Sequence, residues 1–140
     1  MLDEIIANYA VDEDRIYLTG FSWGGSRTYT WAAAAPERFA AIAPMATAGR
    51  PGPACRLRRL PVWVFLGALD FRAQEAILTV QALRDCGVDV TFTLYPNQFH
   101  GVFALPYEAP GLLDWFLAHR RRPPCNRRTT STRSLCHPTL

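Results

Sequence analysis

The pentapeptide G-F-S-W-G at 20–24 follows a short β-rich run, 15–19, and precedes an alanine-rich stretch with helical character. A serine on a tight strand-to-helix turn has a strained backbone, and its neighbours must leave it room. We expect Gly20 and Gly24 to supply that room, and Gly25 to let the helix pack close to the strand. The pentapeptide therefore predicts a fold in which a buried strand leads directly into a helix.

The rest of the chain as far as residue 119 alternates between apolar runs typical of strands and stretches with helical spacing. The expected strands are 15–19, 39–46, 62–66 and 88–95, and the expected helices are 2–9, 22–35, 73–86 and 112–119. Strands that alternate with helices in this way predict an α/β fold with a mostly parallel sheet flanked by helices.

Charge divides the chain into two parts. Residues 1–119 hold 12 acidic residues and 9 arginines, whereas residues 120–140 hold 6 arginines and no acidic residue. We interpret 1–119 as a partial domain and 120–140 as a basic tail without ordered structure. The basic pI belongs to this tail, so it is no evidence for a nucleic-acid surface on the domain, and we expect no nucleic-acid partner. A nucleic-acid or membrane contact made by the tail itself is the alternative to a solvated tail. No run of eighteen apolar residues predicts a transmembrane helix, and the N-terminus does not have the pattern of a signal peptide. We expect no membrane partner.

The four cysteines are Cys55, Cys86, Cys125 and Cys136. Their spacing matches no zinc-binding pattern, and no metal site is expected. We interpret them as free thiols in a reducing compartment, with a Cys125–Cys136 disulfide as the alternative.

Three side chains carry the chemistry that we expect. A serine hydroxyl becomes a nucleophile when a histidine, held by a carboxylate, takes its proton. Ser22 follows the first strand, Asp70 follows strand 62–66, and His100 follows strand 88–95. Because the carboxyl ends of parallel strands meet at one edge of a sheet, we predict Ser22 as nucleophile, Asp70 as acid and His100 as base. The alternative is an ordinary turn, with Ser22 and Asp70 as local caps and His100 without a catalytic partner.

Other titratable residues fit these roles less well. His119 ends a helix, where a cation favours the helix dipole, and His137 lies in the tail. Asp85 and Asp89 flank a turn away from the predicted catalytic edge. Asp114 lies inside a helix and is expected to be solvated.

With the motif V-D-E-D-R-I-Y-L-T-G-F-S-W-G-G at 11–25 and A-P-E-R-F-A-A-I-A-P at 35–44, the chain resembles the esterase branch of the α/β-hydrolase superfamily. It is similar to phospholipase/carboxylesterase, dienelactone-hydrolase-like and polyhydroxybutyrate-depolymerase-like proteins, and to the catalytic domains of prolyl-oligopeptidase-type peptidases. The resemblance covers about residues 1–119 and includes G-A-L-D at 67–70 and Y-P-N-Q-F-H-G at 95–101.

The resemblance implies a serine hydrolase that cleaves small carboxylic esters through an acyl-enzyme, without a metal or an organic cofactor. Two alternatives stay open: a serine peptidase of the prolyl-oligopeptidase type, and an inactive truncated remnant. The backbone N–H of Trp23 would be one donor of the oxyanion hole. Phe21, Phe71 and Phe99 would form an apolar acyl pocket. Phe71 stands where relatives often carry proline, and Trp23 is bulkier than the usual residue and would narrow the acyl site.

The resemblance also implies that part of the fold is missing. The family fold begins with strands that this chain does not contain, and the loop that gives the second oxyanion-hole N–H precedes the nucleophile in such proteins. We therefore interpret the chain as the C-terminal half of an α/β-hydrolase fold. Strand 15–19 would then have an unpaired edge, which favours self-association.

Overall fold

In the computed structural model, which describes residues 1–108 and 111–121, four parallel strands form one sheet in the order in which they occur along the chain. The strands are β1 (Tyr17–Phe21), β2 (Ala41–Met45), β3 (Val62–Gly67) and β4 (Val90–Tyr95). The mostly parallel sheet predicted from the sequence is thus confirmed. Each strand lies within or close to its expected range.

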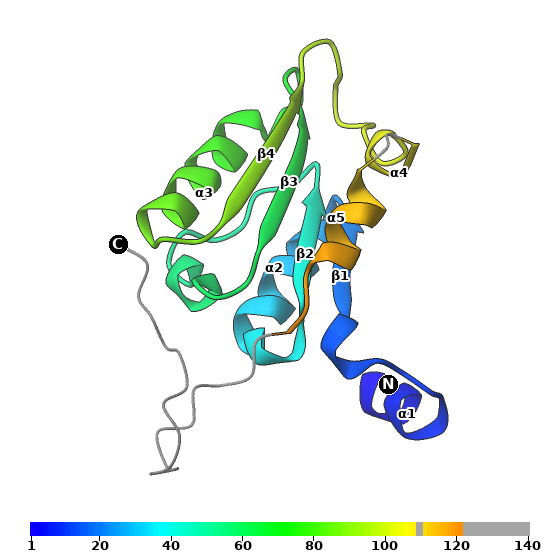
Figure 1. The fold of residues 1–140 in the computed structure, drawn as a ribbon. Coiled ribbons are helices and arrows are strands. Elements are labelled where there is room, and N and C mark those ends of the chain that lie inside the picture. Colours follow the sequence, from blue (N-terminus) through cyan, green and yellow to red (C-terminus); the bar gives the residue numbers. More distant parts are fainter. Residues whose placement is uncertain (109–110, 122–140) are drawn as a thin grey trace.

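Helices cover both faces of the sheet (Figure 1). The α-helices are α1 (Leu2–Asn8), α2 (Trp23–Ala34), α3 (Ala73–Asp85), α4 (Leu105–Glu108) and α5 (Leu112–Ala118). The 3-10 helices are η1 (Glu13–Arg15), η2 (Pro36–Arg38) and η3 (Ala54–Leu57). α2 and α3 cover one face, and α5 covers the other. The short helix α4 was not expected from the sequence.

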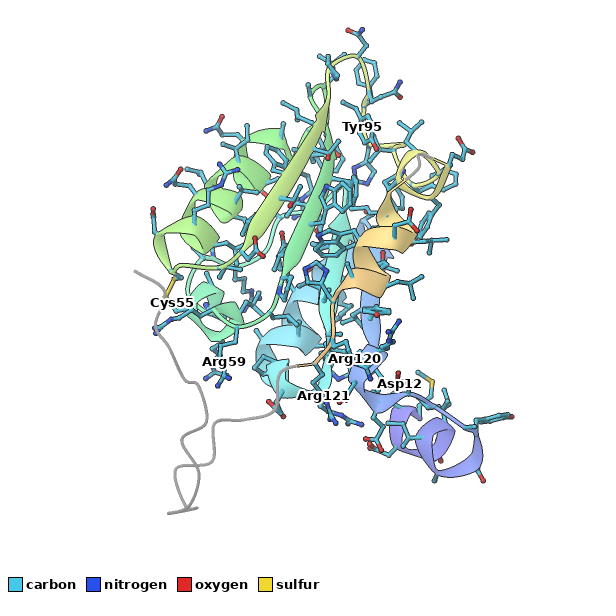
Figure 2. All side chains as sticks on the ribbon, in the orientation of Figure 1. Asp12, Cys55, Arg59, Tyr95, Arg120 and Arg121 are labelled. Atoms are coloured by element: carbon cyan, nitrogen blue, oxygen red, sulfur yellow. A yellow bond between two sulfur atoms is a disulfide. The ribbon has the colours of Figure 1, made fainter. Side chains whose placement is uncertain are left out.

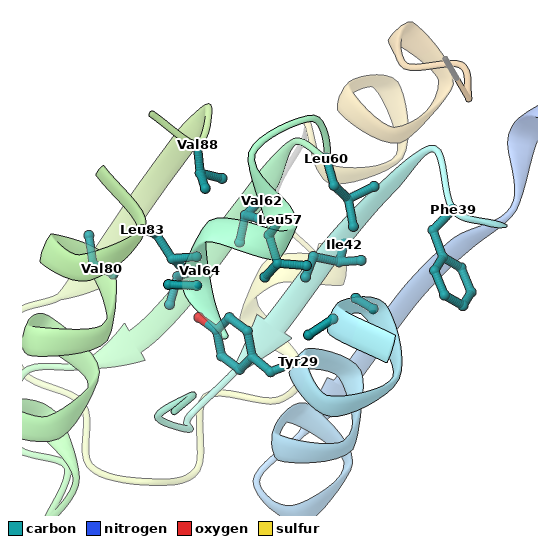
Figure 3. Close-up of a cluster of buried hydrophobic side chains, with 13 residues drawn as sticks. Tyr29, Phe39, Ile42, Leu57, Leu60, Val62, Val64, Val80, Leu83 and Val88 are labelled. Carbon is teal, nitrogen blue, oxygen red and sulfur yellow. The ribbon is translucent and has the colours of Figure 1, made fainter. Parts of the chain in front are cut away.

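Two buried clusters result from this arrangement. The larger one joins α2, η3 and α3 to the sheet and includes Tyr29, Leu57 and Leu83 (Figure 3). The smaller one places Leu112 and Phe116 of α5 against the opposite face. Every residue of β2 is buried, as expected for a central strand covered on both faces.

β1 is an edge strand. Within the described residues it pairs only with β2, so the unpaired edge expected from the sequence is present. Such an edge offers free backbone N–H and C=O groups to another strand. Self-association through β1 stays a prediction.

The expectation of free thiols is wrong for two of the four cysteines. Cys55 in η3 and Cys86 after α3 form a disulfide, with their Cα atoms 4.8 Å apart (Figure 2). The sequence separation of 31 residues hid this pair, because only the packing of η3 against α3 brings the two side chains together. Cys125 and Cys136 lie outside the described residues.

The first two residues of the expected tail make contacts with the domain (Figure 2). Arg120 pairs with Asp12 and Asp14, and the Arg121 side chain and backbone N–H both contact Asp14. The prediction of a tail without ordered structure otherwise falls on residues 122–140, outside the described residues. No helix in the described ranges has the length and apolar character needed to cross a membrane.

Candidate active site

The carboxyl ends of β1, β3 and β4 lie at one edge of the sheet. The parallel register pairs Phe21 with Met45 and Gly67 with Tyr95, so the strands end nearly level. The loops after these strands carry the three side chains predicted to act in chemistry. The register therefore supplies the common edge that the sequence argument required.

Ser22 occupies the turn between β1 and α2 in a conformation rarely adopted outside glycine, with φ 54° and ψ −112°. A residue held in such a region is strained by roughly 1–3 kcal/mol. The Ser22 N–H donates to the Met45 carbonyl over 2.9 Å, and the Ser22 carbonyl accepts from the Ser26 N–H over 3.0 Å. Hydrogen bonds on both sides of the turn thus hold the strained residue at the end of the sheet.

The surrounding glycines differ in what they do. A Cβ on Gly20 would lie 2.4 Å from the carbonyl carbon of Gly24, and one on Gly25 would lie 2.9 Å from the carbonyl oxygens of Gly20 and Met45. These short distances confirm that Gly20 leaves room at the turn and that Gly25 lets the helix pack close to the strand. The expectation for Gly24 is wrong, because no atom lies within 4 Å of its added Cβ. α2 therefore contacts the sheet at Gly25, whereas Gly24 faces open space.

Asp70 is only 5% exposed and its carboxylate has two partners. Its Oδ1 accepts the Arg72 backbone N–H over 2.8 Å, and its Oδ2 lies 2.8 Å from His100 Nδ1. The backbone N–H that fixes the carboxylate was not foreseen from the sequence. It arises because the chain turns at Asp70 just before α3 begins.

The loops after β3 and β4 are joined by their backbones. The Leu69 N–H donates to the Gln98 carbonyl over 2.9 Å. Gly67 permits this approach, because an added Cβ would lie 2.2 Å from the Phe99 carbonyl oxygen and 2.3 Å from that of Gln98. The sequence marks Gly67 only as the end of a strand. Its position directly before the Asp70 loop is the feature that would have indicated this close contact.

His100 completes a chain of hydrogen bonds. Its Nε2 lies 2.8 Å from Ser22 Oγ, and its Nδ1 lies 2.8 Å from Asp70 Oδ2. An uncharged imidazole that carries its proton on Nδ1 donates to Asp70 and accepts the hydroxyl proton of Ser22. The structure therefore brings the three predicted residues together in the order hydroxyl, imidazole, carboxylate. Such an arrangement can remove a proton from Ser22 as its oxygen attacks an electrophile.

Two of the predicted aromatic residues lie against His100. The ring centroids of Phe21 and Phe71 are 5.1 and 4.9 Å from that of His100. Phe103, which the sequence analysis did not single out, packs edge-on against Phe21 at 5.6 Å. Phe99 is 68% exposed and makes no ring contact with any described residue.

Trp23 contributes its backbone N–H to the site, whereas its indole ring is exposed. As the first residue of α2, its N–H has no hydrogen-bond partner among the described residues and lies next to Ser22. The indole is 76% exposed and packs with Arg27, whose guanidinium lies 5.9 Å from the ring centroid. The structure thus leaves one free amide donor beside the hydroxyl.

Two of the other titratable residues named from the sequence have partners elsewhere. His119 Nδ1 lies 2.6 Å from the Trp115 carbonyl, and Asp85 accepts from Gln81 on α3. Asp114 is exposed in the first turn of α5, Asp89 directly precedes β4, and His137 lies outside the described residues. Within residues 1–108 and 111–121, no group of three or more histidine, cysteine, aspartate or glutamate side chains is placed to hold a metal ion.

Comparisons with known proteins find a hydrolase family and structures of esterases and hydrolases. A sequence model described as the dienelactone hydrolase family matches residues 2–111. A thermostable esterase superposes with a TM-score of 0.80 and 29% identity, over 86% of this chain and 35% of the esterase. A putative dienelactone hydrolase from Klebsiella pneumoniae gives a TM-score of 0.66 and 25% identity, over 83% of this chain and 57% of that protein.

A third solved structure, an acylaminoacyl peptidase from Pyrococcus horikoshii, gives a TM-score of 0.60 and 18% identity, over 72% of this chain and 22% of the peptidase. At that identity the likeness is one of fold. No curated protein sequence matches the chain. The chain therefore spans about a third of the esterase and somewhat more than half of the Klebsiella protein.

Proposed function

The chain belongs to the dienelactone hydrolase family, and we propose that it is a serine hydrolase that cleaves carboxylic esters through Ser22, His100 and Asp70. One observation carries the proposal: Ser22 Oγ and Asp70 Oδ2 each lie 2.8 Å from a different nitrogen of the same imidazole. The esterase likeness at 29% identity supports the ester as substrate class.

In the proposed reaction, His100 Nε2 takes the hydroxyl proton while Ser22 Oγ bonds to the ester carbonyl carbon. The carbonyl oxygen becomes an oxyanion, and collapse of this intermediate breaks the bond to the alcohol oxygen, which receives the proton from His100. A water molecule then attacks the acyl-enzyme and gives its proton to His100. The acid leaves, and Ser22 recovers its proton. Asp70 holds the imidazole in place and stabilises its charged form.

The oxyanion would be stabilised by the Trp23 N–H. Enzymes of this fold use a second N–H from a loop that precedes the nucleophile. No such donor lies in the described residues, and loss of one donor typically costs about 100- to 1,000-fold in rate. We therefore expect slow turnover by this chain alone, and faster turnover by a longer protein that supplies the loop.

The acyl group would lie among aromatic side chains. Phe21 and Phe71 contact His100, and we propose that both contact the substrate. Phe71 is 81% exposed, so a bound acyl group would cover apolar surface that now faces solvent. We propose that the exposed Phe99 side chain also contacts the acyl group, at the outer edge of the site.

The test compares hydrolysis of p-nitrophenyl acetate with that of a chromogenic peptide anilide. The proposal predicts ester hydrolysis by the wild-type chain, and its loss in Ser22→Ala. Ser26→Ala, one helical turn further along α2, is the matched control and should retain activity. Faster cleavage of the peptide would favour a peptidase. A folded, soluble chain that cleaves neither compound would favour the inactive remnant.

A further inference from the structure

A cavity of about 520 Å³ lies outside the Ser22–His100–Asp70 site. It is open to solvent on one side and is bounded by α2, the segment 49–57 and α3, and the Cys55–Cys86 disulfide joins η3 to the end of α3. A volume of this size is typical of sites for small organic ligands, which span about 300–1,000 Å³. None of the three proposed catalytic residues lines it.

The floor of the cavity is apolar. Its buried lining comes from Tyr29 and Ala33 on α2, Leu57 in η3, and Leu83 on α3. Thr79 is buried and also lines it, but the single proton of its hydroxyl is already used, because the oxygen lies 2.9 Å from the Glu75 carbonyl and 3.1 Å from the Gly49 carbonyl. The floor therefore favours a ligand with an apolar body.

The rim carries positive charge without a negative counterpart. Arg27, Arg50 and Arg56 line the cavity and are exposed, and no aspartate or glutamate is among the lining residues. The side chains of Arg50 and Arg56 form no ion pair or hydrogen bond within the described residues, and the Arg27 guanidinium lies over the Trp23 ring, 5.9 Å from its centroid. This differs from Arg15, Arg38, Arg72, Arg120 and Arg121, each of which pairs with a carboxylate.

We propose that this cavity binds an organic carboxylate with an apolar body, held by Arg50 and Arg56 at the head and by the buried floor along the chain. Arginine binds carboxylates through paired N–H donors and remains charged at all working pH values. A free phosphate would leave the apolar floor unused. A neutral lipid would leave the arginines without a partner.

The site is separate from the ester-cleaving centre, but it lies close to it. Its wall includes Trp23, whose N–H lies beside Ser22, and Ser26, which hydrogen-bonds to the Ser22 carbonyl. A bound carboxylate would therefore contact the first turn of α2. Binding does not require the Ser22 hydroxyl, so the site is testable without turnover.

The test uses octanoate and its uncharged counterpart octanamide, titrated into the full chain by isothermal calorimetry. The proposal predicts saturable octanoate binding with at least about tenfold higher affinity than octanamide, in line with the strength of charge-assisted hydrogen bonds. The Ser22→Ala chain should bind octanoate as tightly as the wild type. No saturable binding, or equal affinity for the two compounds, would overturn the proposal.

A pair of matched double variants locates the binding. Arg50→Gln with Arg56→Gln should weaken octanoate binding at least about tenfold and leave octanamide unchanged. Arg58→Gln with Arg84→Gln removes the same charge from exposed positions outside the cavity and should have little effect. Equal losses in the two double variants would show attraction by net charge alone and would contradict a built site.

Discussion

Asp70 Oδ2 lies 2.8 Å from His100 Nδ1, although the two residues are 30 positions apart and belong to loops after different strands. A backbone hydrogen bond from Leu69 to Gln98 joins these loops at the same point. The carboxylate is buried and its other oxygen accepts the Arg72 N–H. The acid is therefore held by its surroundings before any substrate binds.

This relationship predicts the effect of Asp70→Asn. An amide in place of the carboxylate no longer fixes the imidazole with its proton on Nδ1 and no longer stabilises the charged form. We expect kcat for p-nitrophenyl acetate to fall by about 1,000- to 10,000-fold, as for the loss of the acid in other serine hydrolases. Steady-state kinetics with enzyme of verified fold measure this effect.

Asp114→Asn is the matched control, because Asp114 is exposed on α5 and outside the site. Its activity should stay within about twofold of the wild type, as is usual for surface substitutions. Equal kcat values for the Asp70→Asn and wild-type chains would remove Asp70 from the mechanism.

Two neighbouring glycines should respond in opposite ways to alanine. Gly25→Ala places a Cβ within 3 Å of two backbone oxygens and of the Thr47 methyl group, so α2 must move away from the sheet. We expect a loss of about 1–3 kcal/mol in the free energy of unfolding. Gly24→Ala meets no atom within 4 Å and gains helix propensity, so it should stabilise the chain by about 0.5–1 kcal/mol.

Urea unfolding followed by circular dichroism compares the two glycine variants. The same sign of change in both would contradict the packing of α2 described above.

The disulfide should contribute measurably to stability. Closing a loop with a separation of 31 residues lowers the entropy of the unfolded chain, which corresponds to about 3–4 kcal/mol. The double variant Cys55→Ser/Cys86→Ser should therefore unfold at lower urea concentration than the oxidised wild type. The wild type treated with a reductant serves as control and should match the variant. Identical unfolding of oxidised and reduced wild type would show that the disulfide adds nothing.

The Tyr29 hydroxyl is buried and has no hydrogen-bond partner among the described residues. Burial raises the pKa of Tyr29, so the hydroxyl stays protonated at neutral pH and its donor stays unsatisfied. Replacing it by phenylalanine removes this cost without removing the ring. We expect Tyr29→Phe to be more stable by about 1–3 kcal/mol, measured as the shift in the urea midpoint at constant slope. A clear loss of stability would indicate a partner for the hydroxyl.

The sequence predicted the strands and the three site residues because both depend on local patterns. Apolar runs bounded by glycine and proline mark β3 and the strands beside it, and parallel topology then brings the residues after each strand to one edge. The G-F-S-W-G motif identifies Ser22, and a carboxylate and an imidazole that each follow a strand identify Asp70 and His100. α4 was missed, because a four-residue helix that contains Pro106 has too few turns to show periodicity.

Features that depend on how elements pack could not be predicted. Whether Gly24 or Gly25 contacts the sheet depends on how α2 is rotated about its own axis. The sequence does not determine this rotation to within one residue. The Cys55–Cys86 pair and the cavity beside it arise from the placement of η3 against α3. Neither the disulfide nor the cavity corresponds to a residue spacing that could be recognised in the sequence.

Labelling with a fluorophosphonate probe is the sharpest test of whether His100 activates Ser22, because the probe reacts with a serine that is activated by a base. We expect a covalent adduct on Ser22, located by mass spectrometry of the digested chain, with no adduct in Ser22→Ala and strongly reduced labelling in His100→Ala. A folded wild-type chain that stays unlabelled, or an adduct on a different residue, would contradict it.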